Sequence, residues 1–273
     1  MKKFIVPVDF SEQSEYALKV AASLAKRHDA EILALHMLEL SEAFISSSEV
    51  NQHQQMLFLI KLAEKRFSDF VKKPFLEGVQ VTPIIKHFKV FNELNEVAKE
   101  QGADLIIMGS HGTDGLKELF IGSNAEKVVR NMDIPVLVIK NDWDDFKVEQ
   151  MVFACDFQKE NLPAYKKAKA FAELLNAQMN LVFINTPGDD FLSTSDAYDR
   201  ISKFQNLAHN GQEVEIYNHY TIEKGILEFS EKTNADLIAI PTHGRKGLLH
   251  FFMGSIGEDI ANHSKIPVMT FKI

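Results

Sequence analysis

The sequence predicts an α/β protein with two tandem doubly wound domains, each a five-stranded parallel sheet flanked by helices. The first observation behind this prediction is a repeat: the segment GADLI at 102–106 returns as NADLI at 234–238, and IPV at 134–136 returns at 266–268, both 132 positions later. The second is that short β-rich runs alternate with longer helical stretches. That alternation is typical of a parallel sheet covered on both faces and linked by right-handed crossovers.

The two copies are related by two different offsets. The segment VDF at 8–10 aligns with CDF at 155–157, which is an offset of 147, whereas the later segments match at an offset of 132. The second copy has therefore lost 15 residues (147 − 132), between about residues 40 and 80 of the first copy. A period near 140 is too long for a solenoid repeat. We therefore predict two homologous domains, at residues 1–141 and 148–273.

The strands of the first copy are predicted from apolar, β-branched runs bounded by turn residues. We place them at residues 4–8, 32–36, 79–85, 105–108 and 136–139. Helical segments of about 15, 20, 10 and 10 residues lie between them. The first helix, near residues 12–28, puts one set of side chains close to a single face: Tyr16, Leu18, Ala21, Ala22, Leu24 and Ala25.

Three further segments bear on packing. Residues 51–73 form an unusually apolar helix, which we expect to cover the sheet or a partner rather than a membrane. The acidic residues 141–145 form a short join between the domains. The fifth strand carries no charge until Lys140 in the first copy and reads VMTF at 268–271 in the second. Because an uncharged edge strand needs a cover or a partner, we expect the copies to pair through their last strands, within one chain or in a homodimer.

The composition is that of an ordinary globular protein and narrows the function classes. Hydrophobic residues make up 45% of the chain and charged residues 25%, which suffices for sizeable cores. The net charge of -8, without a run of five or six like charges, disfavours nucleic-acid binding. No stretch approaches the roughly 18 consecutive apolar residues of a membrane span. The single cysteine, Cys155, fits a reducing compartment, so we expect a cytoplasmic protein that contacts no membrane.

Two features point to one edge of the sheet as the ligand site. In an open parallel sheet, ligands bind beyond the carboxyl ends of the strands, where the strand order reverses. The first predicted strand ends at Asp9, and the fourth runs into a glycine-rich loop at 109–115. That loop closes with GSN at 122–124, at the start of a predicted helix over 125–131. Bare backbone N–H groups and a helix N-terminus together form a cradle suited to a triphosphate.

Each of these signals also has a purely structural interpretation. The segments SNAE at 123–126 and SIGE at 255–258 are capping boxes, so each serine can simply cap its own helix. An aspartate after a strand is often an N-cap, and glycines after a strand are often turn residues. The coincidence of the signals at one edge is what favours a ligand site.

The histidines and the cysteine favour no metal or catalytic centre. His111 and His243 recur at the same loop position, but no second histidine or cysteine lies at ligand spacing nearby. Cys155 has no CxxC partner, so a buried small residue is the better interpretation. We therefore assign no metal ligand and no catalytic residue.

The residues of this edge resemble those of the universal stress protein family. The pattern G-x2-G-x9-G-S that begins at Gly109 is similar to the family's ATP-binding signature, and it is more specific than a lone glycine-rich turn. The segments PVDFS at 7–11, LHM at 35–37 and ADLI at 103–106 strengthen the resemblance, which spans both copies. It implies Rossmann-like domains and a stress-response or signalling role, with ATP as the ligand and Mg²⁺ beside it.

Carried over position by position, the resemblance implies a nucleotide site in the first copy. Asp9 would contact the nucleoside, and the backbone at Met37 and Met108 would line the adenine and the ribose. Pro7 falls at the start of the same pocket. The phosphates would be held by Gly109, Gly112, Gly122, Ser123 and Asn124.

The second copy departs from this pattern. Pro241 replaces the first glycine, and proline fixes φ, removes an N–H and adds a ring. The loop cations Arg245 and Lys246 would favour phosphates, but a surface charge contributes about 1 kcal/mol or less, and a blocked pocket wall outweighs it. We therefore expect the first copy to be the nucleotide site and leave the second open. The candidate residues of the second copy are Asp156, Ile184, Ile240, Gly244, Arg245, Gly254, Ser255 and Ile256.

Three functions compete. The first is an ATP-binding stress or signalling protein with little or slow hydrolysis, since no group is evidently arranged to activate a water. The second is a scaffold that binds no nucleotide, because the family also contains members without the signature. The third is an adenylyl-transfer enzyme, which would need a Ser-Gly-Gly-x-Asp-Ser loop or a His-x-Gly-His motif. Neither segment 9–13 nor segment 156–160 matches these motifs, and the sequence favours the first function.

Overall fold

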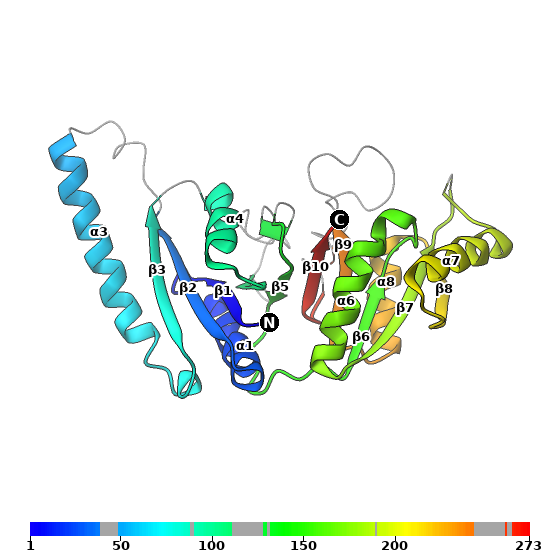
Figure 1. Ribbon diagram of the computed structural model, residues 1–273, viewed down its shortest axis with the longest axis horizontal. Coiled ribbons are helices and arrows are strands. Elements are labelled where there is room, and N and C mark those ends of the chain that lie inside the picture. Colours follow the sequence, from blue (N-terminus) through cyan, green and yellow to red (C-terminus); the bar gives the residue numbers. More distant parts are fainter. Residues whose placement is uncertain are drawn as a thin grey trace. The chain divides into compact units, whose positions relative to one another are not determined.

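The computed structural model describes residues 1–38, 49–87, 90–110, 128–129, 132–188, 190–242, 260 and 264–273 (Figure 1). These residues divide into two compact units. The first unit takes the described residues of Met1–His111 and Leu137–Phe146, and the second takes those of Gly112–Val136 and Lys147–Ile273.

The first unit contains a sheet with helices packed on it (Figure 1). Its strands are β1 (Lys3–Pro7), β2 (Glu31–Leu38), β3 (Val81–His87), β4 (Leu105–Gly109) and β5 (Val136–Ile139). Its helices are α1 (Glu12–His28), α3 (Glu49–Phe70), α4 (Val90–Gln101) and the short 3₁₀ helix η1 (Pro74–Leu76). The sheet order is β3-β2-β1-β4-β5, and the ladders among β3, β2, β1 and β4 are parallel. The strand order therefore reverses between β1 and β4, as in a doubly wound fold.

The second unit repeats this plan (Figure 1). Its strands are β6 (Gln150–Ala154), β7 (Gln178–Asn185), β8 (Val214–Asn218), β9 (Leu237–Thr242) and β10 (Val268–Lys272). Its helices are η2 (Lys159–Asn161), α6 (Leu162–Leu175), α7 (Thr194–Ala208) and α8 (Ile222–Lys232). The sheet order is β8-β7-β6-β9-β10, with four parallel ladders. The predicted fold class, two tandem domains with parallel sheets flanked by helices, is confirmed.

Helix α1 forms where the sequence predicts it, because its ends carry strong local signals. The Ser11 hydroxyl accepts a hydrogen bond from the Ser14 N–H at 3.2 Å and so caps the first turn. Acidic residues lie in the first turn and basic residues in the last, which suits the helix dipole. The chain leaves the helix through Asp29 in the left-handed conformation, with φ 51°. The face that α1 buries consists largely of alanine, leucine and valine.

The corresponding helix of the second unit begins one turn later. Gln158 stands where Ser11 stands in the first unit, and its side chain makes no capping hydrogen bond. The chain first forms η2 and only then α6, which has Pro163 in its first turn. Proline is well tolerated there because that N–H has no helical partner. The two units therefore differ at the carboxyl edge of their first strand.

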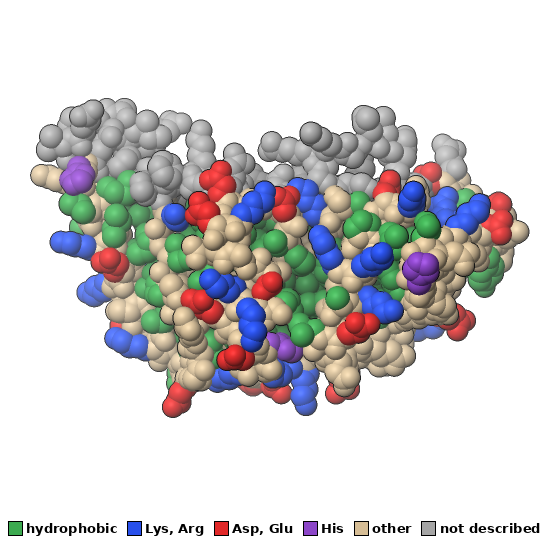
Figure 2. All heavy atoms as spheres, in the orientation of Figure 1, with side chains coloured by type: hydrophobic (Ala, Val, Ile, Leu, Met, Phe, Trp, Pro, Cys, Tyr) green, Lys and Arg blue, Asp and Glu red, His purple; other side chains and the backbone are tan. Residues whose placement is uncertain are grey.

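Helices α3 and α7 account for part of the length difference between the copies. They occupy equivalent places between the second and third strands and contain 22 and 15 residues, respectively. Helix α3 buries Phe67 and Phe70, whereas Leu57 and Phe58 are exposed. Figure 2 shows hydrophobic side chains at the surface along α3. The apolar segment predicted at 51–73 therefore covers the sheet with only part of its surface.

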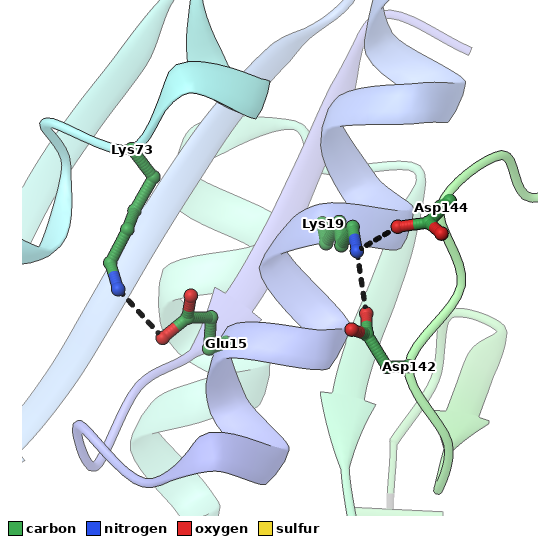
Figure 3. Close-up of polar contacts among 5 residues, drawn as sticks. All are labelled: Glu15, Lys19, Lys73, Asp142 and Asp144. Carbon is green, nitrogen blue, oxygen red and sulfur yellow. Dashed lines mark hydrogen bonds and ion pairs between the residues drawn. The ribbon is translucent and has the colours of Figure 1, made fainter.

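The predicted join between the domains is largely part of the first unit. Lys19 on α1 forms ion pairs with Asp142 at 2.8 Å and with Asp144 at 2.6 Å (Figure 3). Arg27, also on α1, donates a hydrogen bond to the Phe146 carbonyl, and the Phe146 side chain is buried. The segment Asn141–Phe146, which we name the α1 strap, is thus packed against helix α1.

Two smaller predictions concern the cysteine and the membrane. Cys155 is free and fully buried, and it lies just after β6 rather than within it. Burial raises the pKa of its thiol well above the usual value, so the thiol is a poor nucleophile. Among the described helices, none combines the length and the apolar character needed to cross a bilayer. In the face shown in Figure 2, basic and acidic side chains are interspersed.

Candidate functional site

The carboxyl ends of three neighbouring strands bring the predicted nucleoside residues to one edge of the first unit. Pro7 pairs with Leu35 across β1 and β2, and the same parallel register carried two residues further puts Asp9 level with Met37. On the other side, Ile5 pairs with Ile106, which puts Pro7 level with Met108. Residues that lie far apart in the sequence are therefore gathered where the strand order reverses.

Asp9 presents an ionised carboxylate at this edge. It is exposed, and its Oδ1 accepts hydrogen bonds from the Ser11 backbone N–H at 3.0 Å and from the Ser11 hydroxyl at 2.5 Å. Partial burial raises the pKa of Asp9, but the hydrogen bonds from Ser11 and Ser14 outweigh it, and the pKa lies below its ordinary value. At neutral pH the second carboxylate oxygen can therefore accept a hydrogen bond from a ligand hydroxyl or amine.

Gly109, the last residue of β4, is required by packing inside the protein. A Cβ atom at this position would lie 2.1 Å from the carbonyl oxygen of Gln13, in the first turn of α1. Backbone atoms cannot approach a Cβ that closely, so only glycine lets α1 start against β4. The first glycine of the motif thus has a structural role in addition to any contact with a phosphate.

Two residues of this edge were missed by the sequence interpretation. Ser110 follows Gly109 and is only 2% exposed, and its hydroxyl has no hydrogen-bond partner among the residues that the structure describes. Its backbone N–H donates to the Ile139 carbonyl at 2.9 Å, which fixes the start of the loop. On β2, His36 Nδ1 lies 2.7 Å from the Val8 carbonyl oxygen and so ties β2 to the residue before Asp9. Ser110 lies directly after the fourth strand, and His36 lies within the LHM segment that supports the resemblance, but neither was given a role in the site.

The remainder of the predicted phosphate cradle lies outside the described residues. This applies to the loop after Ser110 and to the predicted helix, of which only residues 128–129 are described. The predicted residues outside the described part are His111, Gly112, Gly122, Ser123 and Asn124.

In the second unit the equivalent aspartate is enclosed. Asp156 is 1% exposed, and its Oδ1 accepts hydrogen bonds from the Gln158 N–H at 2.9 Å and from Asn161 Nδ2 at 2.5 Å. Burial raises the pKa of Asp156 more than these hydrogen bonds lower it. Asn161 stands where Ser14 stands in the first unit, and its own Oδ1 is buried without a partner. The second aspartate is therefore not presented to a ligand as the first one is.

The other residues predicted for a nucleotide site in the second unit are either buried or outside the described residues. Ile184 on β7 and Ile240 on β9 are both buried. Pro241 lies within β9, where it pairs with Phe271 of β10, and is not the first residue of a loop. Outside the described residues lie His243, Gly244, Arg245, Gly254, Ser255 and Ile256.

The second unit differs from the first both in the late start of α6 and in having Pro241 at the position of Gly109. In the first unit the backbone of Gln13 occupies the space beside Gly109. In the second unit Glu160 takes the place of Gln13 and belongs to η2 instead of the helix. A proline ring needs space that a glycine leaves empty, so the altered helix start and Pro241 are compatible with each other. Among the described residues of both units, no cluster of histidine, cysteine, aspartate or glutamate could hold a metal ion.

Comparison with known proteins assigns both halves of the chain to the same family. The model of the universal stress protein family matches residues 1–140 and again residues 147–272. The tandem arrangement predicted from the repeat is thereby confirmed.

Two curated relatives each match about half of this chain. Universal stress protein MJ0531 from Methanocaldococcus jannaschii is 33% identical over 149 residues, which is 51% of this chain and 82% of that protein. Universal stress protein YxiE from Bacillus subtilis is 30% identical over 152 residues, 50% of this chain and 98% of that protein. A universal stress protein structure from Archaeoglobus fulgidus aligns with a TM-score of 0.74, covering 99% of this chain and 98% of that chain at 23% identity, and so shares the tandem fold.

Proposed function

The protein belongs to the universal stress protein family, with one domain of that family in each half, and we propose that its first domain binds ATP or a closely related adenine nucleotide. Asp9 contacts the nucleoside, and the loop that begins after Gly109 holds the phosphates, with Mg²⁺ beside them. Binding shifts the conformation or the partner choice of a stress-response or signalling module.

The observation that carries this proposal is the exposed, ionised carboxylate of Asp9 at the strand-order reversal. Met37 and Met108 lie level with the end of β1 and supply apolar surface for a purine ring. The buried Ser110 hydroxyl, which has no partner among the described residues, supplies a donor at the start of the phosphate loop. A nucleotide would supply partners for both groups. Its hydroxyl and amine groups can donate hydrogen bonds to Asp9, and its phosphate oxygens can accept one from Ser110.

We propose that hydrolysis is slow or absent. A general base for water attack works best when its pKa lies near the operating pH. The pKa of Asp9 lies below its ordinary value, because Ser11 and Ser14 donate hydrogen bonds to its ionised form. Asp9 is therefore a weak base, suited to binding a hydroxyl group rather than to removing a proton from water.

The second domain, in this proposal, supports the first without binding nucleotide in the same way. The enclosed carboxylate of Asp156 is engaged by Asn161, and Pro241 takes the place of the glycine. The pairing of the two domains through their last strands, a homodimer and a cytoplasmic location remain predictions from the sequence.

Two measurements test the nucleotide proposal. The freshly purified protein is denatured, and the supernatant is analysed for adenine nucleotide by chromatography and mass spectrometry. ATP with Mg²⁺ is then titrated calorimetrically into the wild type, Asp9→Asn and Asp156→Asn. We expect Asp9→Asn to weaken ATP binding at least about tenfold, or about 1.4 kcal/mol, because the amide repels a donor on one side, and Asp156→Asn to change it less than about twofold.

Either of two results would contradict the proposal. If no nucleotide is released and ATP gives neither heat nor a thermal shift, the protein is a scaffold without a nucleotide. If the two variants lose affinity equally, both domains bind in the same manner and the asymmetry is wrong.

A further inference from the structure

The second unit contains a cavity next to the enclosed Asp156, and the two residues that follow Asp156, Phe157 and Gln158, belong to its lining. It has a volume of about 540 Å³ and lies between the residues that follow β6 and helix α7. Its apolar part is formed by Phe157, Leu192, Phe204 and Leu207. The other six of its ten lining residues are polar or charged, so a ligand that fits it needs a polar as well as an apolar part.

The cavity exists because one aromatic ring of the first unit has no counterpart here. Phe10 packs on Phe67 of α3 with ring centroids 5.1 Å apart, and Phe157 packs on Phe204 of α7 in the same way at 5.3 Å. Three residues after Phe67, the ring of Phe70 also packs against Phe10, at 5.5 Å, and is buried. Three residues after Phe204 stands Leu207, which is 43% exposed. The smaller side chain leaves open the volume that Phe70 fills in the first unit.

Three cations line the opening. They are Lys159 on η2 and Arg200 and Lys203 on α7. Among the described residues, none forms an ion pair with Lys159 or Lys203, whereas Arg200 interacts electrostatically with the buried Asp156. The guanidinium of Arg200 lies over the ring of Phe183 on β7, 5.9 Å from its centroid, which holds its charge in place. These cations are therefore available to an anionic group at the mouth of the cavity.

Two carboxylates limit the charge that the cavity can accept. Asp196 and Asp199 also line it. Asp196 accepts a hydrogen bond from the Ser193 hydroxyl at 2.7 Å in the first turn of α7. The lining has three positive and two negative charges, and the positive charge of Arg200 is also shared with Asp156 beside the cavity. A triphosphate would bring several negative charges against these carboxylates, whereas a group with one negative charge meets less repulsion.

We propose that this cavity is a ligand site of the second domain for an amphipathic monoanion, a molecule with an apolar or aromatic body and one carboxylate or sulfonate-like group. The apolar body lies against Leu192 and Leu207, beside the buried rings of Phe157 and Phe204. The anionic group lies between Arg200 and Lys203. This site is distinct from the nucleotide site proposed for the first domain and does not depend on it.

The test uses two fluorescent probes that share an aromatic framework. 1-Anilinonaphthalene-8-sulfonate carries one sulfonate, and N-phenyl-1-naphthylamine is its uncharged counterpart. Both are titrated into the full-length protein and three variants. Arg200→Gln/Lys203→Gln removes charge, Leu207→Phe fills the cavity as Phe70 does in the first unit, and Lys167→Gln on the exposed surface of α6 is the control.

We expect one sulfonate-probe site per chain. The double variant should weaken binding of the sulfonate probe about tenfold and binding of the uncharged probe less than about twofold. The reason is that the two cations stabilise only the bound anionic group. Leu207→Phe should abolish binding of both probes while the thermal midpoint stays within about 2 °C of the wild type. Lys167→Gln should change neither affinity.

Three outcomes would overturn the proposal. Sulfonate binding that survives Leu207→Phe would place the probe elsewhere. Equal losses of both probes in the double variant would show that the cations do not select an anion. ATP that displaces the sulfonate probe, together with weaker ATP binding in Leu207→Phe, would make this cavity a nucleotide site, which is an outcome separate from the Asp9→Asn result.

Discussion

Gly109 carries no side chain because the backbone of Gln13 lies where a Cβ atom would be. We predict that Gly109→Ala destabilises the protein by about 2 kcal/mol or more, since backbone must move to admit the methyl group. Gly211→Ala is the matched control, because a Cβ atom there would meet no atom within 4 Å. Guanidinium denaturation measures both. Equal, small changes in the two variants would contradict the packing role of Gly109.

The two equivalent aspartates should respond to pH with opposite signs. The folded-state pKa of Asp9 lies below its ordinary value of 3.8, so its ionised form stabilises the protein above that pH and the contribution is lost as pH falls. Burial places the folded-state pKa of Asp156 above 3.8, so stability is lost as pH rises through the interval between 3.8 and the raised value.

We therefore predict that Asp9→Asn lowers the thermal midpoint at neutral pH, whereas Asp156→Asn leaves it unchanged or raises it. An asparagine at position 156 keeps an oxygen for Gln158 and Asn161 while it removes the buried charge. Thermal unfolding between about pH 3 and 7 measures this, and the difference between the variants should shrink at the acid end. Midpoints that shift in the same direction in both variants at neutral pH would refute the opposite environments.

At the scale of the element, the α1 strap combines surface ion pairs with one buried ring. Lys19 pairs with Asp142 and Asp144 at the surface (Figure 3), where solvent screens the charges. Phe146 is 1% exposed and packs edge-on against Trp143 at 5.7 Å. Apolar burial therefore outweighs the ion pairs.

For this reason Phe146→Ala should lower the free energy of unfolding by about 3 kcal/mol, whereas Lys19→Gln should have little effect. Denaturant titration of the full-length protein gives both values. A larger loss from Lys19→Gln than from Phe146→Ala would reverse this ranking and show that charge holds the strap.

Local signals decide which elements can be predicted from sequence. The two ends of α1 can be predicted from the local sequence, because Ser11 and the acidic first turn mark its start and Asp29 marks its end. The late start of α6 has weaker local signals, namely a residue without a capping hydrogen bond at Gln158 and Pro163 in the first turn. That it occurs together with a proline at position 241, about 80 residues further along the chain, is not marked by any local pattern.

At the scale of the whole molecule, the repeat predicts two similar folds, and the structure shows the same strand order in both units. The repeat does not predict that the units present their shared aspartate differently. Asp9 and Asp156 stand in the aligned segments VDF at 8–10 and CDF at 155–157, yet one is exposed and the other is 1% exposed and accepts a hydrogen bond from the Asn161 side chain. Likewise, the cavity beside α7 depends on Leu207 standing where α3 has Phe70, a difference that matters only once the helices are packed.

The late start of α6 also bears on whether the second domain could regain the properties of the first. Replacing Pro241 by glycine alone would leave Asn161 on Asp156 and η2 before the helix. Replacing Asn161 alone would leave the proline in the strand. Restoring the arrangement of the first domain therefore calls for changes at the strand end and at the helix start together.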